Sequence, residues 1–266
     1  MDYTTVAFPG LGIDFFTMNK VAIPIFGGIR WYAIIIAAGF LLAAFYCLKR
    51  VKQFELTMDN LLDVIIYSLP AAVIGARIYY VLFMPGSYNS FWEYFAIWQG
   101  GLAIYGAVIA AAITAYTVSR VKKLDFKQVF DLGALGLLIG QAIGRFGNFV
   151  NGEAFGGTTD LPWGMLIKGA ATTPVHPTFL YEALWNILGF VILHFYSKRR
   201  KFAGEIFLLY VFWYGLGRVF IEGMRQDSLY FFGMRVSQVL AGASCLAAAV
   251  VLGVCYFKGR KSAVKK

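Results

Sequence analysis

Three arginines lie inside long apolar stretches of this sequence, where a charged side chain is costly. They are Arg77, Arg145 and Arg218. On membrane-insertion scales an arginine at the bilayer centre costs about 2.5–3.5 kcal/mol, and such residues usually serve a function. A guanidinium group stays charged and donates paired hydrogen bonds to phosphate. The type and placement of these residues therefore indicate a site for an anionic phospholipid.

Polar residues accompany Arg145 at helical spacing. Arg145, Asn148 and Gly152 follow one another at intervals of three and four residues, so they share one face of a helix. Asn151 and Glu153 come at the end of the same apolar run. Earlier in this run the glycines form a ladder that would let a neighbouring helix approach closely. They are Gly133, Gly136, Gly140 and Gly144. Packing explains these glycines, but it does not explain the polar residues.

A second polar stripe surrounds Arg218. Tyr214, Arg218, Glu222 and Arg225 are spaced by four, four and three residues, so they line one side of an otherwise apolar helix. An intrahelical ion pair between Arg218 and Glu222 would explain part of this pattern, and it contributes about 0.2–0.5 kcal/mol when exposed. Such a pair is compatible with a role in a site.

Seven apolar runs are long enough to span a membrane, since a spanning helix needs about 20 residues. They cover residues 31–48, 60–83, 101–118, 131–150, 178–196, 205–221 and 236–257. The chain is 59% hydrophobic and 14% charged, whereas a soluble domain carries about 25% charged residues. We expect an all-α polytopic membrane protein, with residues 1–266 forming a single integral membrane domain.

The charge distribution predicts the orientation of these helices. Sixteen of the 24 lysines and arginines follow the first, third, fifth and seventh runs, and five lie on the other side. Basic residues favour the cytoplasmic side, so we expect the N-terminus outside and the C-terminus in the cytoplasm. The basic tail, residues 258–266, would then lie at the anionic inner surface. Because the charge of +10 falls in short clusters between apolar runs, a nucleic-acid partner is not expected.

This orientation predicts that the arginines share one depth. Arg77, Arg145 and Arg218 each come 13 to 17 residues after the start of an outward run, which is about 20–26 Å at ~1.5 Å per residue. The first run points inward, which puts Arg30 and Tyr32 at the same outer level. We expect these residues to gather near the outer headgroups. The alternative is that each guanidinium only reaches interfacial water, and it stays open for Arg30 and Arg77.

The segment 144–156, GRFGNFVNGEAFG, closely resembles the signature of the bacterial prolipoprotein diacylglyceryl transferases. The segments IRWY, WQGGLAIYG, HPTFLYE and YGLGRVFIEGMRQ resemble that family's other blocks in the same order. The resemblance implies a protein of the bacterial cytoplasmic membrane with its active site toward the outer leaflet. It implies transfer of the diacylglyceryl group of phosphatidylglycerol to the lipobox cysteine of a prolipoprotein signal peptide. A thioether would form and glycerol phosphate would leave, with no metal or other cofactor required.

The resemblance also implies roles for individual residues. Arg145 would bind the phospholipid phosphate, and Arg218 would stabilise the charge that develops on the leaving group. Glu153 and Glu222 would orient these arginines. The residues expected to bind phosphatidylglycerol are Arg145, Asn148, Asn151, Gly156, Tyr32, Tyr214 and Arg77.

The base that accepts the thiol proton stays open. Where some members of the family have histidine after the Gly-Gly pair, this chain has Tyr105, and the ordinary tyrosine pKa near 10 suits a base poorly. His176 and Glu153 are the other candidates. A thiol is already partly ionised at neutral pH, so an electropositive cavity could also activate it. The catalytic candidates are Arg145, Arg218, Tyr105, Glu153, Glu222 and His176.

Two further interpretations come from the residues alone. In HPTFLYE, Thr178 is expected to cap the start of a helix and Glu182 to support that end. For the whole chain, a transporter or flippase for an anionic lipid would use the same arginines. Transporter sites usually lie near the midplane between repeats, whereas the polar residues here gather on one side. Membrane lipids are expected partners in either case.

Overall fold

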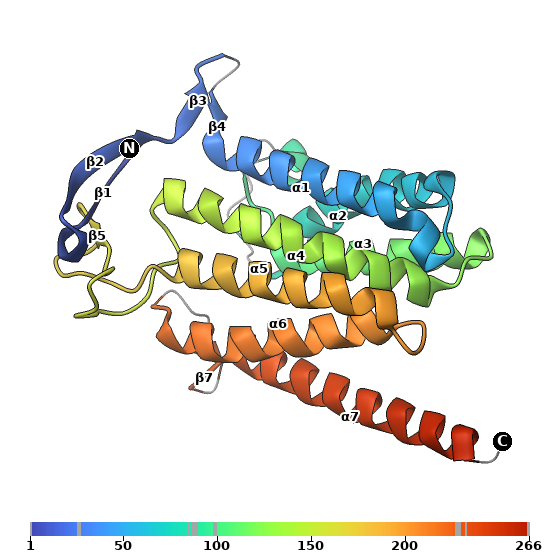
Figure 1. Cartoon of the computed structure of the whole chain (residues 1–266). Coiled ribbons are helices and arrows are strands. Elements are labelled where there is room, and N and C mark those ends of the chain that lie inside the picture. The colour runs from blue at the N-terminus through green and yellow to red at the C-terminus, as the bar shows by residue number, and fades with distance from the viewer. Residues whose placement is uncertain are drawn as a thin grey trace. The chain divides into compact units, whose positions relative to one another are not determined.

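The computed structural model describes residues 2–25, 28–83, 86, 90–97, 100–226, 230–231 and 233–264. Within these residues, seven helices are long and apolar enough to cross a membrane. They are α1 (Trp31–Arg50), α2 (Met58–Phe83), α3 (Ile104–Val121), α4 (Phe126–Asn151), α5 (Thr178–Tyr196), α6 (Glu205–Met224) and α7 (Val236–Val264) (Figure 1). The all-α, seven-span membrane fold is confirmed. Trp98 and Gln99 of the WQGG block, and Lys265 and Lys266 of the tail, lie outside the described residues.

Most helices begin and end close to the predicted runs. The run 178–196 matches α5 at both ends. By contrast, α4 begins at Phe126, five residues before its apolar run. The side chain of Asp125 explains this early start, because its Oδ1 accepts a hydrogen bond of 3.0 Å from the backbone N–H of Lys127 and so caps the helix.

Short strands precede α1, which the sequence analysis did not foresee. β1 (Tyr3–Phe8) and β2 (Ile13–Asn19) form an antiparallel hairpin, and β5 (Leu166–Ile167) adds to β1, so the strand order is β2-β1-β5. Gly12 has a φ of 68° at the hairpin turn, a conformation that glycine adopts readily. The remaining strands are β3 (Val21–Ile23), β4 (Ile29–Arg30), β6 (Tyr230–Phe231) and β7 (Met234–Arg235). The short 3-10 helices are Pro9–Leu11, Val51–Phe54, Phe91–Phe95 and Ser197–Arg199.

The three-stranded sheet packs on the first turn of α5 through a small apolar core. This core consists of Val6, Met165, Ile167, Val175 and Phe179. Phe149 of α4 stacks on the ring of Phe179 at 4.5 Å. The loop between α4 and α5 is therefore anchored at both ends.

The described chain divides into two compact units, Met1–Cys47 with Gly133–Lys266, and Leu48–Leu132. In the first unit α6 packs against both α5 and α7 (Figure 1).

Two of the four glycines in the α4 ladder allow a close approach of α1. A Cβ on Gly136 would lie 2.9 Å from Cys47 Sγ, and one on Gly144 would lie 3.2 Å from Ile36 Cδ1, both on α1. Gly133 and Gly140 face open space.

In the second unit α2 and α3 approach through a pair of glycines. A Cβ on Gly106 would lie 2.2 Å from the carbonyl oxygen of Gly75. A Cβ on Gly75 would lie 2.7 Å from the carbonyl oxygen of Gly106. Only glycine permits this backbone contact, which fixes the two helices against each other.

Candidate functional site

One buried carboxylate near the start of α5 binds three arginines. Glu182 is 4% exposed. Arg145 Nη2 of α4 lies 2.5 Å from Glu182 Oε2. Arg218 Nη1 of α6 lies 3.0 Å from Oε2 and 3.2 Å from Oε1. Arg225 Nη1, just beyond α6, lies 3.6 Å from Oε1. Two of the three arginines that the sequence singled out, Arg145 and Arg218, are therefore brought together on one side chain.

A second carboxylate completes this group. Glu222 Oε2 lies 2.5 Å from Arg218 Nη2 in an i,i+4 pair on α6, as the spacing predicted. We call the five residues Arg145, Glu182, Arg218, Glu222 and Arg225 the Glu182 cluster. Its carboxylates are 5% and 2% exposed, while its arginine side chains keep 12–18% of their surface. Three guanidinium groups face two carboxylates within the cluster, and the arginines form its exposed edge.

Gly156 allows the end of α6 to approach the start of α5. The backbone N–H of Gly156 donates to His176 O at 2.9 Å, and that of Gly157 donates to Met224 O at 2.8 Å. A Cβ on Gly156 would lie 2.7 Å from His176 Cβ and 3.0 Å from Met224 O. This close junction places Arg225 beside the first turn of α5.

Two tryptophans fix α5 against α6. The rings of Trp185 and Trp213 stack at 4.3 Å with an interplanar angle of 17°. Each indole N–H donates to the backbone carbonyl of the other tryptophan at 3.0 Å. The rings lie over Gly189 and Gly217, where a Cβ would come within 2.4 and 2.2 Å of an indole nitrogen. This contact sets the register in which Glu182 faces Arg218.

Asparagines of the signature segment bind Glu153. Asn148 Nδ2 and Asn151 Nδ2 donate to Glu153 Oε1 at 2.9 and 3.1 Å. The hydroxyl of Tyr32 is close enough to interact with the charges of Glu153 and Arg145. Glu153 therefore accepts hydrogen bonds from two asparagines, and not from the arginines that it was expected to orient.

His176 lies at the junction of the α4–α5 loop with α5. Its Nδ1 is 3.2 Å from the hydroxyl of Tyr181. That hydroxyl accepts a hydrogen bond of 2.8 Å from Trp163 Nε1. The backbone carbonyl of His176 accepts from the N–H of Gly156, and its own N–H donates to Gly157 O, both at 2.9 Å, so this residue is held by a local network.

The contacts of Glu182 with the arginines were not predicted from the sequence. Glu182 and Thr178 were expected to cap the helix, but Pro177 occupies the N-cap position, and the Thr178 hydroxyl donates to Ala154 O instead. A usable signal was present, because a glutamate inside an apolar run is as costly as an arginine. Matching each intramembrane acid with an arginine would have drawn attention to Glu182.

Arg77 and Tyr105 belong to the second compact unit. Arg77 is 8% exposed, and its guanidinium donates to four backbone carbonyls. The acceptors are Tyr94 O at 2.9 Å, Gly100 O at 2.8 Å, Gly101 O at 3.1 Å and Glu93 O at 2.5 Å. Tyr105 lies with its ring 6.2 Å from that of Tyr79. Arg30, in the first unit, is an exposed residue of β4.

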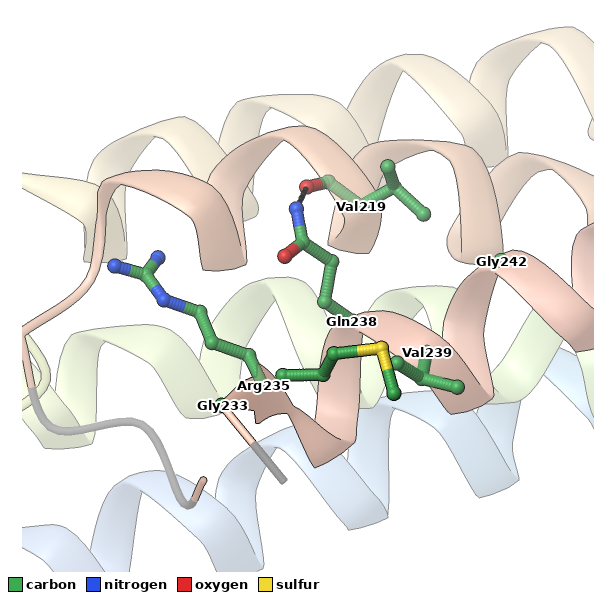
Figure 2. Close-up of a pocket in the computed structure, with 7 residues that line it drawn as sticks. Val219, Gly233, Arg235, Gln238, Val239 and Gly242 are labelled. Carbon is green, nitrogen blue, oxygen red and sulfur yellow. Dashed lines mark hydrogen bonds between the residues drawn. The ribbon is translucent and has the colours of Figure 1, made fainter. Parts of the chain in front are cut away.

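A pocket lies between α6, β7 and α7 (Figure 2). It has a volume of about 480 Å³, and its lining is mostly apolar. Gln238 Nε2 donates to Val219 O at 2.9 Å across it. The guanidinium of Arg235 points away from Gln238 (Figure 2) and donates to Glu222 O. Arg235 therefore ties β7 to the end of α6, next to the Glu182 cluster. Among the described residues, no group of three or more His, Cys, Asp or Glu side chains could hold a metal ion.

Comparison with known proteins gives one consistent result. Residues 20–254 match the family described as prolipoprotein diacylglyceryl transferase. A protein of Finegoldia magna is 43% identical over 244 residues, which cover 91% of this chain and 97% of that protein. One of Clostridioides difficile is 40% identical over 84% of this chain and 90% of its own length. One of Oceanobacillus iheyensis is 45% identical over 84% of this chain and 83% of its own length. All three are named phosphatidylglycerol–prolipoprotein diacylglyceryl transferase.

Proposed function

The chain belongs to the prolipoprotein diacylglyceryl transferase family, and we propose that the Glu182 cluster is where its transfer reaction takes place. The protein is a multi-pass membrane transferase that acts on phosphatidylglycerol and a prolipoprotein, in the first step of lipoprotein maturation. The names of the relatives do not favour the transporter reading.

The observation that carries this proposal is the sharing of Glu182 by Arg145 and Arg218. Glu182 holds two guanidinium groups from different helices together before substrate arrives, and Arg225 adds a third. Because the arginines are more exposed than the carboxylates, an anion can reach the exposed edge of the cluster without displacing Glu182. Guanidinium groups are suited to phosphate, and their interactions strengthen where water is scarce. The phosphate of phosphatidylglycerol is the anion that we assign to this edge.

In the proposed reaction, the lipobox cysteine sulfur attacks the glycerol carbon that bears the phosphate. The C–O bond to phosphate breaks, its electron pair stays on the phosphate oxygen, and a thioether forms. Glycerol phosphate leaves, and the thiol proton passes to a base or to the leaving group. Arg145 binds the phosphate throughout, while Arg218 stabilises the charge that develops on the leaving oxygen. Such pre-positioned donors supply large rate enhancements because they need no reorganisation during the reaction.

The residues around the signature segment would hold the glycerol portion of the lipid. Asn148 and Asn151 are already oriented by Glu153, and their remaining amide atoms can bind hydroxyl groups. Tyr32 lies within reach of the same charges. Within the first unit, His176 and Glu153 are the candidates for the thiol base. The hydrogen bond between His176 and Tyr181 supports an oriented imidazole.

The site would face the outer leaflet of the bacterial cytoplasmic membrane. This follows from the charge bias, which favours an external N-terminus and a cytoplasmic C-terminus. With this orientation, the end of α4 and the start of α5 both lie on the outer side. A prolipoprotein signal peptide would then present its lipobox cysteine from the outer half of the bilayer.

Purified protein tests this proposal directly. The protein is incubated with phosphatidylglycerol vesicles and a lipobox peptide, and the peptide is followed by mass spectrometry. An enzyme adds one diacylglyceryl group to the cysteine and releases glycerol phosphate in equal amount. If Arg145→Gln and Arg218→Gln leave this product unchanged, the reaction takes place elsewhere. A transporter would move labelled lipid across the vesicle membrane without modifying the peptide.

A further inference from the structure

A second, much smaller pocket lies between α5 and α6, next to the Glu182 cluster. Its volume of about 10 Å³ is enough for about one water-sized group. Glu182 and Arg218 form one wall of this pocket, so it is continuous with the proposed phosphate site. The rest of the lining consists of Trp185, Asn186, Tyr214, Gly217 and Ile221.

Asn186 gives this pocket an unsatisfied hydrogen-bond acceptor. The residue is 2% exposed, and its Oδ1 is fully buried without a hydrogen-bond partner among the described residues. A buried acceptor without a partner costs about 1–3 kcal/mol. Most such atoms in folded proteins are satisfied by protein or by ordered water. An acceptor that lines a pocket of this size therefore indicates a site for one O–H donor.

The position of Asn186 connects this donor to the substrate. Asn186 follows Glu182 by four residues on α5, so the two side chains lie on the same face, about 6 Å apart along the axis. In phosphatidylglycerol, the hydroxyl groups of the glycerol headgroup are only a few covalent bonds away from the phosphate. A phosphate held at the edge of the Glu182 cluster would therefore bring these hydroxyl groups close to the pocket. The headgroup of phosphatidylglycerol and a resident water molecule both offer the O–H donor that Oδ1 lacks.

We propose that this pocket binds one hydroxyl group through Asn186 Oδ1 and that it determines the preference for a glycerol headgroup. The proposal rests on the assignment of the phosphate to the Glu182 cluster. Tyr214 and Trp185 shape the pocket, and the stacking of Trp185 on Trp213 keeps its wall in place. A headgroup without hydroxyl groups would leave the acceptor unsatisfied.

The test compares phosphatidylglycerol with phosphatidylpropanol, which has the same phosphate but no headgroup hydroxyl. The wild-type protein should bind and use phosphatidylglycerol about tenfold better, which is the contribution of one hydrogen bond between neutral groups. Asn186→Leu removes the acceptor at similar volume, so it should raise KM for phosphatidylglycerol about tenfold with little change in kcat. Its KM for phosphatidylpropanol should remain that of the wild type. Asn186→Ser keeps an oxygen and should restore part of the preference.

The outcomes separate the two sources of the hydroxyl. If Asn186→Leu loses the same factor on both lipids, the donor is a resident water, and the hydroxyl site stands without a role in headgroup preference. Unchanged KM on both lipids would overturn the proposal. Asn60→Leu, in the first turn of α2, controls for the change of residue type.

Binding measured by native mass spectrometry keeps this test independent of turnover. If the proposed function fails, Arg218→Gln binds and transfers as the wild type does. If only the hydroxyl pocket fails, Arg218→Gln is inactive while Asn186→Leu retains the wild-type preference between the two lipids.

Discussion

Arg145 and Arg218 lie 2.5 and 3.0 Å from the same oxygen atom, Glu182 Oε2. The two arginines belong to different helices and repel each other in the absence of a counter-ion. Glu182 removes this repulsion while the guanidinium groups retain partial exposure. The relationship explains how two guanidinium groups can lie side by side inside an apolar bundle.

Replacing either arginine by lysine tests the need for the guanidinium group. Lysine keeps the charge, but it cannot donate two parallel hydrogen bonds to phosphate. We expect Arg145→Lys and Arg218→Lys to lower kcat/KM by about 100-fold or more, as for loss of one pre-positioned donor. The measurement is the rate of peptide modification. Arg120→Lys, at the exposed end of α3, should retain the wild-type rate, and full activity of both site variants would contradict their roles.

Neutralising Glu182 tests its function as the shared counter-ion. Glu182→Gln keeps the shape but leaves three guanidinium groups opposite one carboxylate. Removing one partner of a buried ion pair costs about 3–5 kcal/mol, and we expect about 3 because the arginines are partly exposed. Thermal unfolding in detergent should show this loss of stability as a lower melting temperature. The peptide-modification assay should show reduced transfer. Glu55→Gln, an exposed residue of the second unit, serves as the control. A Glu182→Gln protein of unchanged melting temperature would show that the arginines do not need this carboxylate.

Two adjacent glycines provide a matched test of the junction between α5 and α6. A Cβ on Gly156 would lie 2.7 Å from His176 Cβ, whereas one on Gly157 has no neighbour closer than 3.9 Å. We expect Gly156→Ala to cost about 1–3 kcal/mol of unfolding free energy through overpacking and to reduce transfer sharply. Gly157→Ala should be nearly neutral in both assays. Equal effects at the two positions would mean that the close approach at Gly156 is not required.

Arg77 is predicted to organise a loop rather than to bind lipid. Arg77→Lys cannot reach the four carbonyl groups that the guanidinium binds, and hydrogen bonds to a charged group contribute about 1.5–3 kcal/mol each. Hydrogen–deuterium exchange should therefore become faster in residues 90–97 and 100–101. The KM for phosphatidylglycerol should stay near the wild-type value. A raised KM with unchanged exchange would instead support the phosphate-binding role that the sequence suggested.

Hydropathy predicted the helices well because apolar length is a strong local signal. The predicted run 178–196 begins and ends at the same residues as α5. The hairpin of β1 and β2 was not predicted, because its strands are much shorter than a membrane-spanning run and β5, which pairs with β1, lies far away in the sequence. The early start of α4 was missed for a different reason, because it depends on the capping side chain of Asp125, which hydropathy does not detect.

The candidate site was predictable in part. Helical spacing correctly paired Arg218 with Glu222, because both residues lie on one helix. Depth along the membrane suggested that Arg145 and Arg218 would meet, but spacing cannot reveal which carboxylate joins residues of different helices. For this reason Glu182 was overlooked, and Glu153 was linked to arginines although it binds Asn148 and Asn151. At Arg77, an expected depth does not reveal that the guanidinium donates to four nearby backbone carbonyls.

The stacked indoles of Trp185 and Trp213 give this protein an intrinsic optical reporter. Electronic transitions of two rings 4.3 Å apart couple, and the coupling produces a paired band of opposite signs in circular dichroism. The amplitude of this band depends on the separation and angle of the rings. It therefore records any sliding of α5 along α6 while lipid binds, reacts and leaves, without an attached label.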